Sequence, residues 1–291
     1  MRCACVDIGT NTTRLLVAER TDDGVREVVA VRRFMRLTCA ADGTIPAATV
    51  AGVAELVAAH VRLAREHGAL PVHAVATAAI RQAPNRDELC RAVQDAAGVP
   101  VEVLTGEQEA ALAFAGALAS LERPPGGLIG VIDVGGGSSE LVTGTAGQGV
   151  TWSASLAVGS GVLAERHLRS DPPALEELAA VRAEVDAALA GVHAPVPLAV
   201  LAVGGSATAL AGEAGGELAP ETIARVLSVL IEHPAADAAR RLGLHIERVK
   251  LLPTGLLVLE AAWEALGGAP LRVARGGLRE GVVLRALAAR S

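Results

Sequence analysis

The chain opens with apolar residues at strand spacing. Residues 3–8 and 15–19 carry the apolar positions, and the Gly-Thr-Asn turn between them favours a β-hairpin. A third strand is expected over residues 25–34. The first part of the chain is therefore expected to form a three-stranded meander.

Helical and strand patterns alternate over the rest of the first half. The expected order is helix, strand, helix, strand, helix, over residues 50–66, 72–77, 87–97, 101–104 and 105–121. Thr105 and Gln108 have the spacing of a capping box, which starts the last of these helices. The alternation is typical of an α/β fold.

The opening motif recurs after a break at residues 122–127, which read Glu-Arg-Pro-Pro-Gly-Gly. The strand that ends in Asp-x-Gly at residue 7 returns at residue 133, again followed by a turn of small residues and a second apolar strand. The offset of 126 residues is about one domain. We therefore expect an α/β protein of two duplicated domains, residues 1–123 and 124–291, whose similar turns face each other across a cleft.

The second half carries one further glycine turn. A buried strand over residues 198–203 leads into Gly204-Gly205-Ser206 and then a helix. This turn is either a phosphate or sugar contact or only a tight connection from strand to helix. Helical spacing predicts further helices over residues 175–189, 222–231, 256–266 and 278–288.

Composition narrows the class of protein. The 291 residues are 51% hydrophobic and 20% charged, which is typical of a packed globular chain. The longest apolar runs are shorter than the roughly 20 residues that cross a bilayer, and the first residues lack a signal-peptide core. A net charge of −6 and the scarcity of aromatic residues argue against nucleic acid as a partner. We expect a cytoplasmic protein that binds neither nucleic acid nor membrane.

The cysteines and basic residues add two smaller observations. Four cysteines without paired spacing indicate buried free thiols, and Cys3 and Cys5 should share one face of a strand. Lys250 is the one lysine, and the other 25 of 26 basic residues are arginine, which contacts phosphate in a bidentate manner. A GC-rich coding sequence would produce the same bias.

The two duplicated turns are the strongest candidates for chemistry. Their small residues let backbone N–H groups approach phosphate oxygens, and their hydroxyls add donors. An aspartate at the end of each strand, Asp7 and Asp133, can hold Mg²⁺ directly or through water. A hairpin turn with an Asx cap explains either copy alone, but two copies in register favour a shared role.

Three charged residues lie at positions that suit a site. Arg81 follows a buried strand, where open α/β folds place ligand contacts, although a solvated arginine is the alternative. Glu109 lies at a helix start, where an acid also complements the helix dipole. Glu140 begins a strand, which is unfavourable for an acid unless it faces a site or solvent. The histidines have no metal-ligand spacing.

Together these residues resemble the exopolyphosphatase and guanosine pentaphosphate phosphohydrolase family, which belongs to the actin, sugar-kinase and Hsp70 superfamily. The resemblance covers nearly the whole chain in the family's order. The motifs that carry it are Asp7-Ile8-Gly9-Thr10-Asn11-Thr12, Arg81, Gly106-x-x-Glu109-Ala110, Asp133-Val134-Gly135-Gly136-Gly137-Ser138-Ser139-Glu140, Gly204-Gly205-Ser206 and Gly277-Leu278-Arg279-Glu280-Gly281. The fold it implies is a pair of actin-like, or ribonuclease H-like, domains.

The resemblance also implies a division of labour. Glu109 would orient or deprotonate the attacking water, and Glu140 would assist from the other domain. Asp7 and Asp133 would hold Mg²⁺. The groups that would bind phosphate oxygens are Asn11, Thr12, Arg81, Gly135, Gly136, Gly137 and Ser138. Phosphoryl transfer requires charge neutralisation and in-line positioning more than covalent help, so such a set is chemically suitable.

Three positions depart from the family's pattern. Val162 stands where an arginine usually follows Gly-Ser-Gly, Lys250 where an aspartate is common, and Arg275 where Ser or Asp precedes the final Gly-Leu-Arg-Glu-Gly. The last two add positive charge, which could compensate in a polyanion cleft or mark an altered specificity. The extra C-terminal helical domains of longer members are missing, so we expect the two-domain catalytic core.

The expected activity is Mg²⁺-dependent hydrolysis of the terminal phosphate of inorganic polyphosphate. The first alternative is hydrolysis of guanosine pentaphosphate, which would connect the protein to the stringent response. A catalytically weak polyphosphate-binding or signalling protein is the second. A sugar or acid kinase of the superfamily is the third, but no residue pattern provides its acceptor site. Oligomeric state stays open, with a homodimer as one option.

Overall fold

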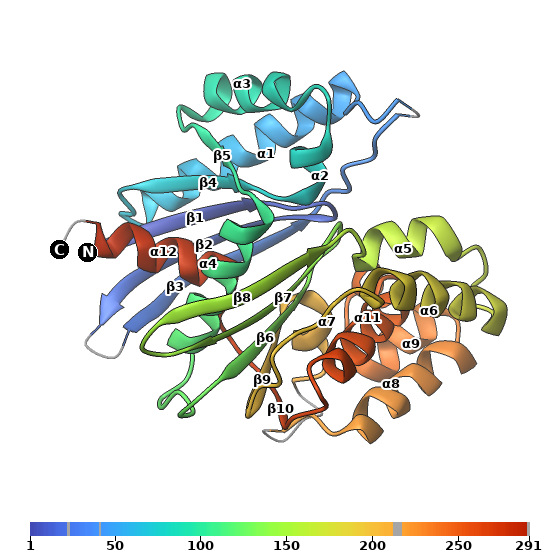
Figure 1. Cartoon of the computed structure of the whole chain (residues 1–291). Helices are drawn as coiled ribbons and strands as arrows, with labels where there is room; N and C mark the ends of the chain where they lie inside the picture. Colours follow the sequence, from blue (N-terminus) through green and yellow to red (C-terminus); the bar gives the residue numbers. More distant parts are fainter. Residues whose placement is uncertain (22–23, 41, 212–216, 290–291) are drawn as a thin grey trace. The chain divides into compact units, whose positions relative to one another are not determined.

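The computed structural model describes residues 1–21, 24–40, 42–211 and 217–289 (Figure 1). The chain divides into two compact units. The first is made of Met1–Glu122 together with Gly276–Ser291, and the second of Arg123–Arg275. Each unit contains one five-stranded sheet with helices packed on it.

The first unit has a mixed sheet in the order β3-β2-β1-β4-β5. Strands β1 to β3 form an antiparallel meander, and β4 and β5 run parallel to β1. The elements are β1 (Arg2–Ile8), β2 (Thr12–Thr21), β3 (Gly24–Phe34), α1 (Ala47–Glu66), β4 (Val72–Ala76), α2 (Ala78–Gln82), α3 (Arg86–Ala97), β5 (Val101–Val103), α4 (Gly106–Ala119) and α12 (Leu278–Ala288). The expected meander and the alternation that follows it are confirmed.

The second unit repeats this topology. Its sheet has the order β8-β7-β6-β9-β10, again an antiparallel meander followed by two parallel strands. The elements are β6 (Ile129–Val134), β7 (Ser139–Thr145), β8 (Gly149–Leu156), α5 (Ser160–His167), α6 (Leu175–Leu189), β9 (Ala199–Val203), α7 (Gly204–Ala209), α8 (Pro220–Glu232), α9 (Ala235–Leu242), α10 (Ile246–Val249), α11 (Leu252–Ala265) and β10 (Leu271–Val273). The equal order and strand directions confirm the duplication inferred from the repeated motif.

Alternation along β1 separates two cores in the first unit. Ala4, Val6 and Ile8 pack with apolar residues of α1 and α3. Cys3 and Cys5 point to the opposite face, where they pack with apolar residues of α12. The prediction that these two thiols share a face is confirmed. The prediction of buried thiols is wrong for Cys39, which is exposed because it lies in an irregular segment after β3, and Cys90 is only partly buried.

The last helix belongs with the first unit. Figure 1 shows α12 (red) beside α4 and β1. Backbone meets backbone here: a Cβ built on Gly116 would lie 1.9 Å from the carbonyl oxygen of Gly277, and one on Gly281 would lie 2.0 Å from that of Leu112. Arg285 also pairs with Glu102 of β5. The expected second domain, 124–291, is therefore too long at its end, because residues 276–291 return to the first sheet.

Helix α1 is the one helix of the described residues that is long and apolar enough to cross a membrane. Length and composition alone give that result. Its apolar face, which includes Val53, Val57 and Val61, is buried against the first sheet. This packing accounts for the hydropathy of α1 within a folded core, and the absence of a membrane partner stays a prediction.

The second unit has one continuous core. Apolar residues of β6 and β9 pack with those of α6, α8 and α11, and Trp152 and Trp263 lie partly buried against them. Trp263 donates its indole N–H to the carbonyl of Ala269 at 2.6 Å. Helices α6, α8, α11 and α12 were expected from periodicity, whereas the short helices α5, α9 and α10 and the strands β8 and β10 were not, because short elements carry too few apolar positions to show a period.

Candidate functional site

The two duplicated turns have the same internal hydrogen bond. In the first, the N–H of Gly9 donates to the carbonyl of Thr12 at 3.0 Å; in the second, Gly135 donates to Ser138 at 3.0 Å. A Cβ on Gly135 would lie 2.8 Å from the Ser138 carbonyl oxygen, so a larger residue would push the turn open. The glycines therefore allow a tight closure that both copies share.

The carbonyl groups of both turns are held by the chain that follows each meander. The Thr10 carbonyl accepts from Leu37, and the Asn11 carbonyl accepts from Met35. In the second unit, the Gly135 carbonyl accepts from Ser160, and the Gly136 carbonyl accepts from Gly161 and Val162. Val162 thus anchors the turn through its backbone, whichever side chain it carries.

This anchoring leaves N–H groups of the second turn for a ligand. In the part of the chain that the structure describes, the N–H groups of Gly136 and Gly137 donate to no other backbone group. Gly159 packs directly behind them, since a Cβ there would lie 2.6 Å from the Gly136 carbonyl carbon. The turn is a rigid loop of donors, which suits an anion.

Asp7 ends β1 in a buried position. Its Oδ1 atom has no hydrogen-bond partner among the described residues. Burial raises the pKa of this carboxyl above its usual value, while the nearby positive charges of Arg14, Arg279 and Arg32 act in the opposite direction. A buried carboxylate oxygen without a donor is costly unless a ligand compensates for it.

Asp133 occupies the matching position at the end of β6. Its Oδ1 atom would lie 2.7 Å from a Cβ built on Gly204, and Gly204 has a φ of +89°, a conformation that favours glycine. Gly204-Gly205-Ser206 forms the first turn of α7 directly after β9. The tight connection from strand to helix, packed against Asp133, is therefore confirmed, and a phosphate or sugar contact at the same turn stays a prediction.

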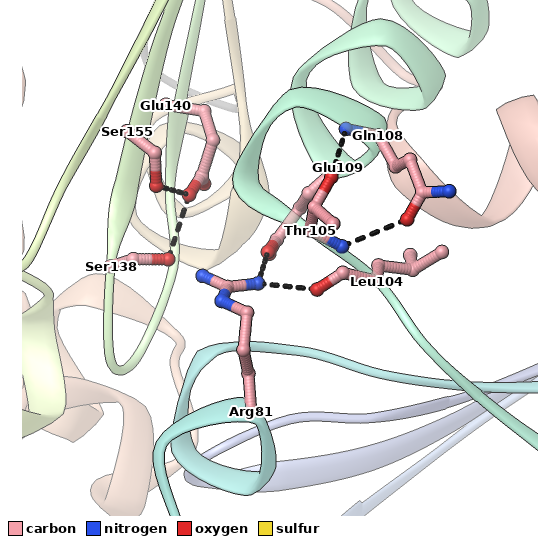
Figure 2. Close-up of polar contacts among 8 residues, drawn as sticks. All are labelled: Arg81, Leu104, Thr105, Gln108, Glu109, Ser138, Glu140 and Ser155. Carbon is pink, nitrogen blue, oxygen red and sulfur yellow. Dashed lines mark hydrogen bonds and ion pairs between the residues drawn. The ribbon is translucent and has the colours of Figure 1, made fainter.

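Glu140 is almost completely buried on β7, with 1% of its surface exposed. Its Oε1 atom accepts hydrogen bonds from the hydroxyls of Ser138 at 2.7 Å and Ser155 at 2.9 Å (Figure 2). Ser138 belongs to the glycine turn, but Ser155 lies on β8 and belongs to no motif. Only the antiparallel pairing of Glu140 with Ser155 brings it to the site.

Arg81 and Glu109 form an ion pair within the first unit. Arg81 lies on α2 after β4, and its Nη1 atom donates to the Glu109 Oε2 atom at 3.0 Å and to the Leu104 carbonyl at 2.7 Å (Figure 2). Glu109 lies buried at the start of α4. The expected capping box is confirmed, with Thr105 and Gln108 exchanging hydrogen bonds at 2.9 and 3.1 Å. It fixes the turn of helix that carries Glu109.

Each unit gathers its own share of the expected site. Asn11 lies in the first turn and Thr12 begins β2, where its hydroxyl accepts a hydrogen bond from Arg14 at 3.1 Å. The first unit thus supplies Asp7, Asn11, Thr12, Arg81 and Glu109. The second supplies Asp133, Gly135, Gly136, Gly137, Ser138 and Glu140.

The residues present suit one kind of metal site. Among the described residues, no group of three or more His, Cys, Asp or Glu side chains could hold a metal ion by itself. Mg²⁺ usually binds through one or two carboxylates, waters and substrate phosphates, and does not need such a cage. Asp7, with a buried oxygen that lacks a donor, fits that pattern, and Asp133 is the corresponding carboxylate of the second unit.

Comparisons with known proteins cover almost the entire chain. A model described as the Ppx/GppA phosphatase family matches residues 16–290. Exopolyphosphatase 1 of Mycobacterium leprae is 29% identical over 99% of this chain and 90% of its own length. Exopolyphosphatase 2 of Mycobacterium tuberculosis is 34% identical over 68% of this chain and 64% of its own length.

The fold is also known from solved structures. The crystal structure of the Aquifex aeolicus member of the Ppx/GppA protein family superposes with a TM-score of 0.83 at 28% identity, and covers 100% of this chain and 99% of that one. The likeness confirms the expected α/β fold of two duplicated actin-like domains.

Proposed function

The chain belongs to the Ppx/GppA phosphatase family, whose members hydrolyse phosphoanhydride bonds, and we propose that its own reaction is the Mg²⁺-dependent removal of the terminal phosphate from inorganic polyphosphate. The main support is the pair of duplicated turns with the same closed geometry, the N–H groups of Gly136 and Gly137 that donate to no other backbone group of the described residues, and buried carboxylates in both units. The match to exopolyphosphatase 1 of M. leprae over almost its full length supports the same substrate class.

In this proposal Glu109 is the general base. Its carboxylate accepts a proton from water, the water oxygen forms a bond to the terminal phosphorus, and the bond from phosphorus to the bridging oxygen breaks. Arg81 holds the Glu109 carboxylate with one N–H group and retains further donors for phosphate oxygens. One arginine thereby couples the position of the base to that of the substrate.

The second unit supplies anion contacts and a second acid. N–H groups of Gly136 and Gly137 bind phosphate oxygens, and Glu140 helps to orient the attacking water. Asp7 of the first unit and Asp133 of the second are the carboxylates that would hold Mg²⁺, and the metal would neutralise charge on the phosphate oxygens. None of these contacts requires a nucleobase.

The burial of the aromatic side chains favours polyphosphate over guanosine pentaphosphate as the substrate. Both tryptophans pack against the second core, Phe114 is 3% exposed, and Phe34 is 37% exposed. Stacking on an aromatic ring contributes roughly 1 to 3 kcal/mol per base. Phe34 is thus exposed, the two tryptophans are partly buried against the second core, and Phe114 is buried, so little aromatic surface is available for a guanine ring, whereas a chain of phosphates needs only anion contacts.

The test measures released phosphate with polyphosphate, guanosine pentaphosphate and ATP, each with and without Mg²⁺. The proposal expects turnover of polyphosphate that depends on Mg²⁺ and a lower kcat/KM for both nucleotides. A higher kcat/KM for guanosine pentaphosphate would overturn the choice of substrate. Equal rates without Mg²⁺ in chelated buffer would overturn the role of the metal.

A further inference from the structure

The duplicated sheets place a row of three polar residues at matching positions, but with different charges. In the second unit the row is Asp133, Glu140 and Ser155, which are directly opposed across β6, β7 and β8. In the first unit the corresponding row is Asp7, Arg14 and Arg32, opposed across β1, β2 and β3. The aspartate is shared, and the second and third positions differ.

The row in the second unit brings two acids together. Directly opposed residues on neighbouring strands have Cβ atoms about 5 Å apart, and like charges there are unfavourable. The buried Glu140 therefore needs donors that stabilise its charge and fix its direction. A glutamate carboxylate turns easily about its last torsion, which is broad and two-fold, so packing of the stem alone does not orient it.

Two serine hydroxyls donate to Glu140, one from the preceding turn and one from the neighbouring strand. Ser138 precedes Glu140 in the turn, and Ser155 reaches it from the neighbouring edge strand; both donate to the same atom, Oε1. Two donors on one oxygen define the plane of the carboxylate better than either does alone. Ser155 is exposed and therefore contributes little to packing, so its contribution to the site is the hydrogen bond from its hydroxyl.

We propose that Ser155 is a positioning residue that holds the Glu140 carboxylate in its working orientation. The inference rests on the proposed role of Glu140 in the phosphatase reaction. A hydrogen bond to an ionised group and a small misplacement of a reacting group each change rates by about tenfold or more. Loss of the Ser155 hydroxyl should therefore lower kcat by about tenfold and leave KM for polyphosphate nearly unchanged.

The test compares S155A, S155T, S153A and E140Q with the wild type. Ser153 lies two residues away on the same face of β8, and its side chain makes no hydrogen bond within the described part of the chain, so S153A is the matched control. S155T keeps a hydroxyl and suits a strand. Crystal structures of the wild type and S155A supply a readout that does not depend on activity.

The expected result is a lower kcat for S155A, kinetics close to wild type for S153A, recovery in S155T, and a rotated or disordered Glu140 carboxylate in the S155A crystal. Equal kinetics for S155A and S153A beside an impaired E140Q would overturn the inference while leaving the proposed function intact. If the wild type does not hydrolyse polyphosphate, or if E140Q is fully active, the proposed function fails and the crystal structures test the positioning role separately. A Glu140 carboxylate in the same orientation in S155A and the wild type would then overturn that role.

Discussion

The crossing of α4 and α12 predicts that Gly116→Ala destabilises the protein. Gly116 is buried at the point where the two helices touch, and an added Cβ would lie 1.9 Å from the Gly277 carbonyl oxygen and 2.8 Å from the Gly281 nitrogen. Observed Cβ atoms essentially never approach closer than 3.0 Å, so α12 must move by at least about 1 Å. Backbone atoms on both sides leave no flexible side chain to absorb the overlap.

Two opposing effects set the size of the change. Alanine is favoured over glycine inside a helix by about 1 kcal/mol, which would stabilise α4. Overpacking of a close contact costs about 1 to 3 kcal/mol, and more where neighbours cannot yield. The overlap here involves backbone, so the upper end applies and the net loss is about 2 kcal/mol. At about 2 to 4 °C per kcal/mol, Tm falls by about 4 to 8 °C.

The assay is urea and thermal unfolding of wild type, G116A and G191A. Gly191 is the matched control, because no atom lies within 4 Å of its added Cβ and its φ is ordinary. Polyphosphate hydrolysis by G116A should also fall, since α4 carries Glu109. A G116A protein as stable as the wild type, or more stable, would show that helix propensity outweighs the contact and refute the reasoning.

Four further predictions concern single residues. Glu109→Gln should lower kcat for polyphosphate by about 10²- to 10⁴-fold in a phosphate-release assay, and a change of only a few-fold would shift the role of base to Glu140. Arg81→Lys should reduce kcat/KM about tenfold, because Nη1 alone contacts both Leu104 and Glu109 and leaves the other guanidinium donors for phosphate, which a single ammonium does not have; unchanged kinetics would contradict this phosphate-binding role. Burial raises the pKa of Asp7, so the ionised carboxylate destabilises the fold, and stability is lost as pH rises through the folded-state pKa. Asp7→Asn should therefore raise Tm at pH 7, and this gain should shrink toward pH 3. The same variant should lose activity. The ring nitrogens of His60 have no hydrogen-bond partner among the described residues, and burial, with the nearby charge of Arg33, lowers the pKa of this side chain. Stability should therefore be lost as pH falls below about 6.5. Thermal melts at pH 7.5 and 5.5 should show this loss in the wild type and not in His60→Leu.

Local chemistry is enough to predict the duplication and the two turns. The strand that ends at Asp7 and the strand that ends at Asp133 are recognisable because alternation, glycines and a polar strand end act over a few neighbouring residues. The capping box at Thr105 is local in the same sense, since both partners lie within one helical turn. The hairpin that opens each sheet follows from these local signals.

Tertiary structure alone decides which distant segments meet. Periodicity predicts α12 as a helix but not its sheet, because the contact that returns it to the first unit joins Gly116 and Gly277 across the sequence. The ion pair of Arg81 with Glu109 and the hydrogen bond of Ser155 with Glu140 likewise connect residues whose separation carries no local signal. The sequence by itself determined the repeated hairpins and the residue types at their ends; strand register and helix packing, which depend on the whole core, decided which of those side chains hold one another in place.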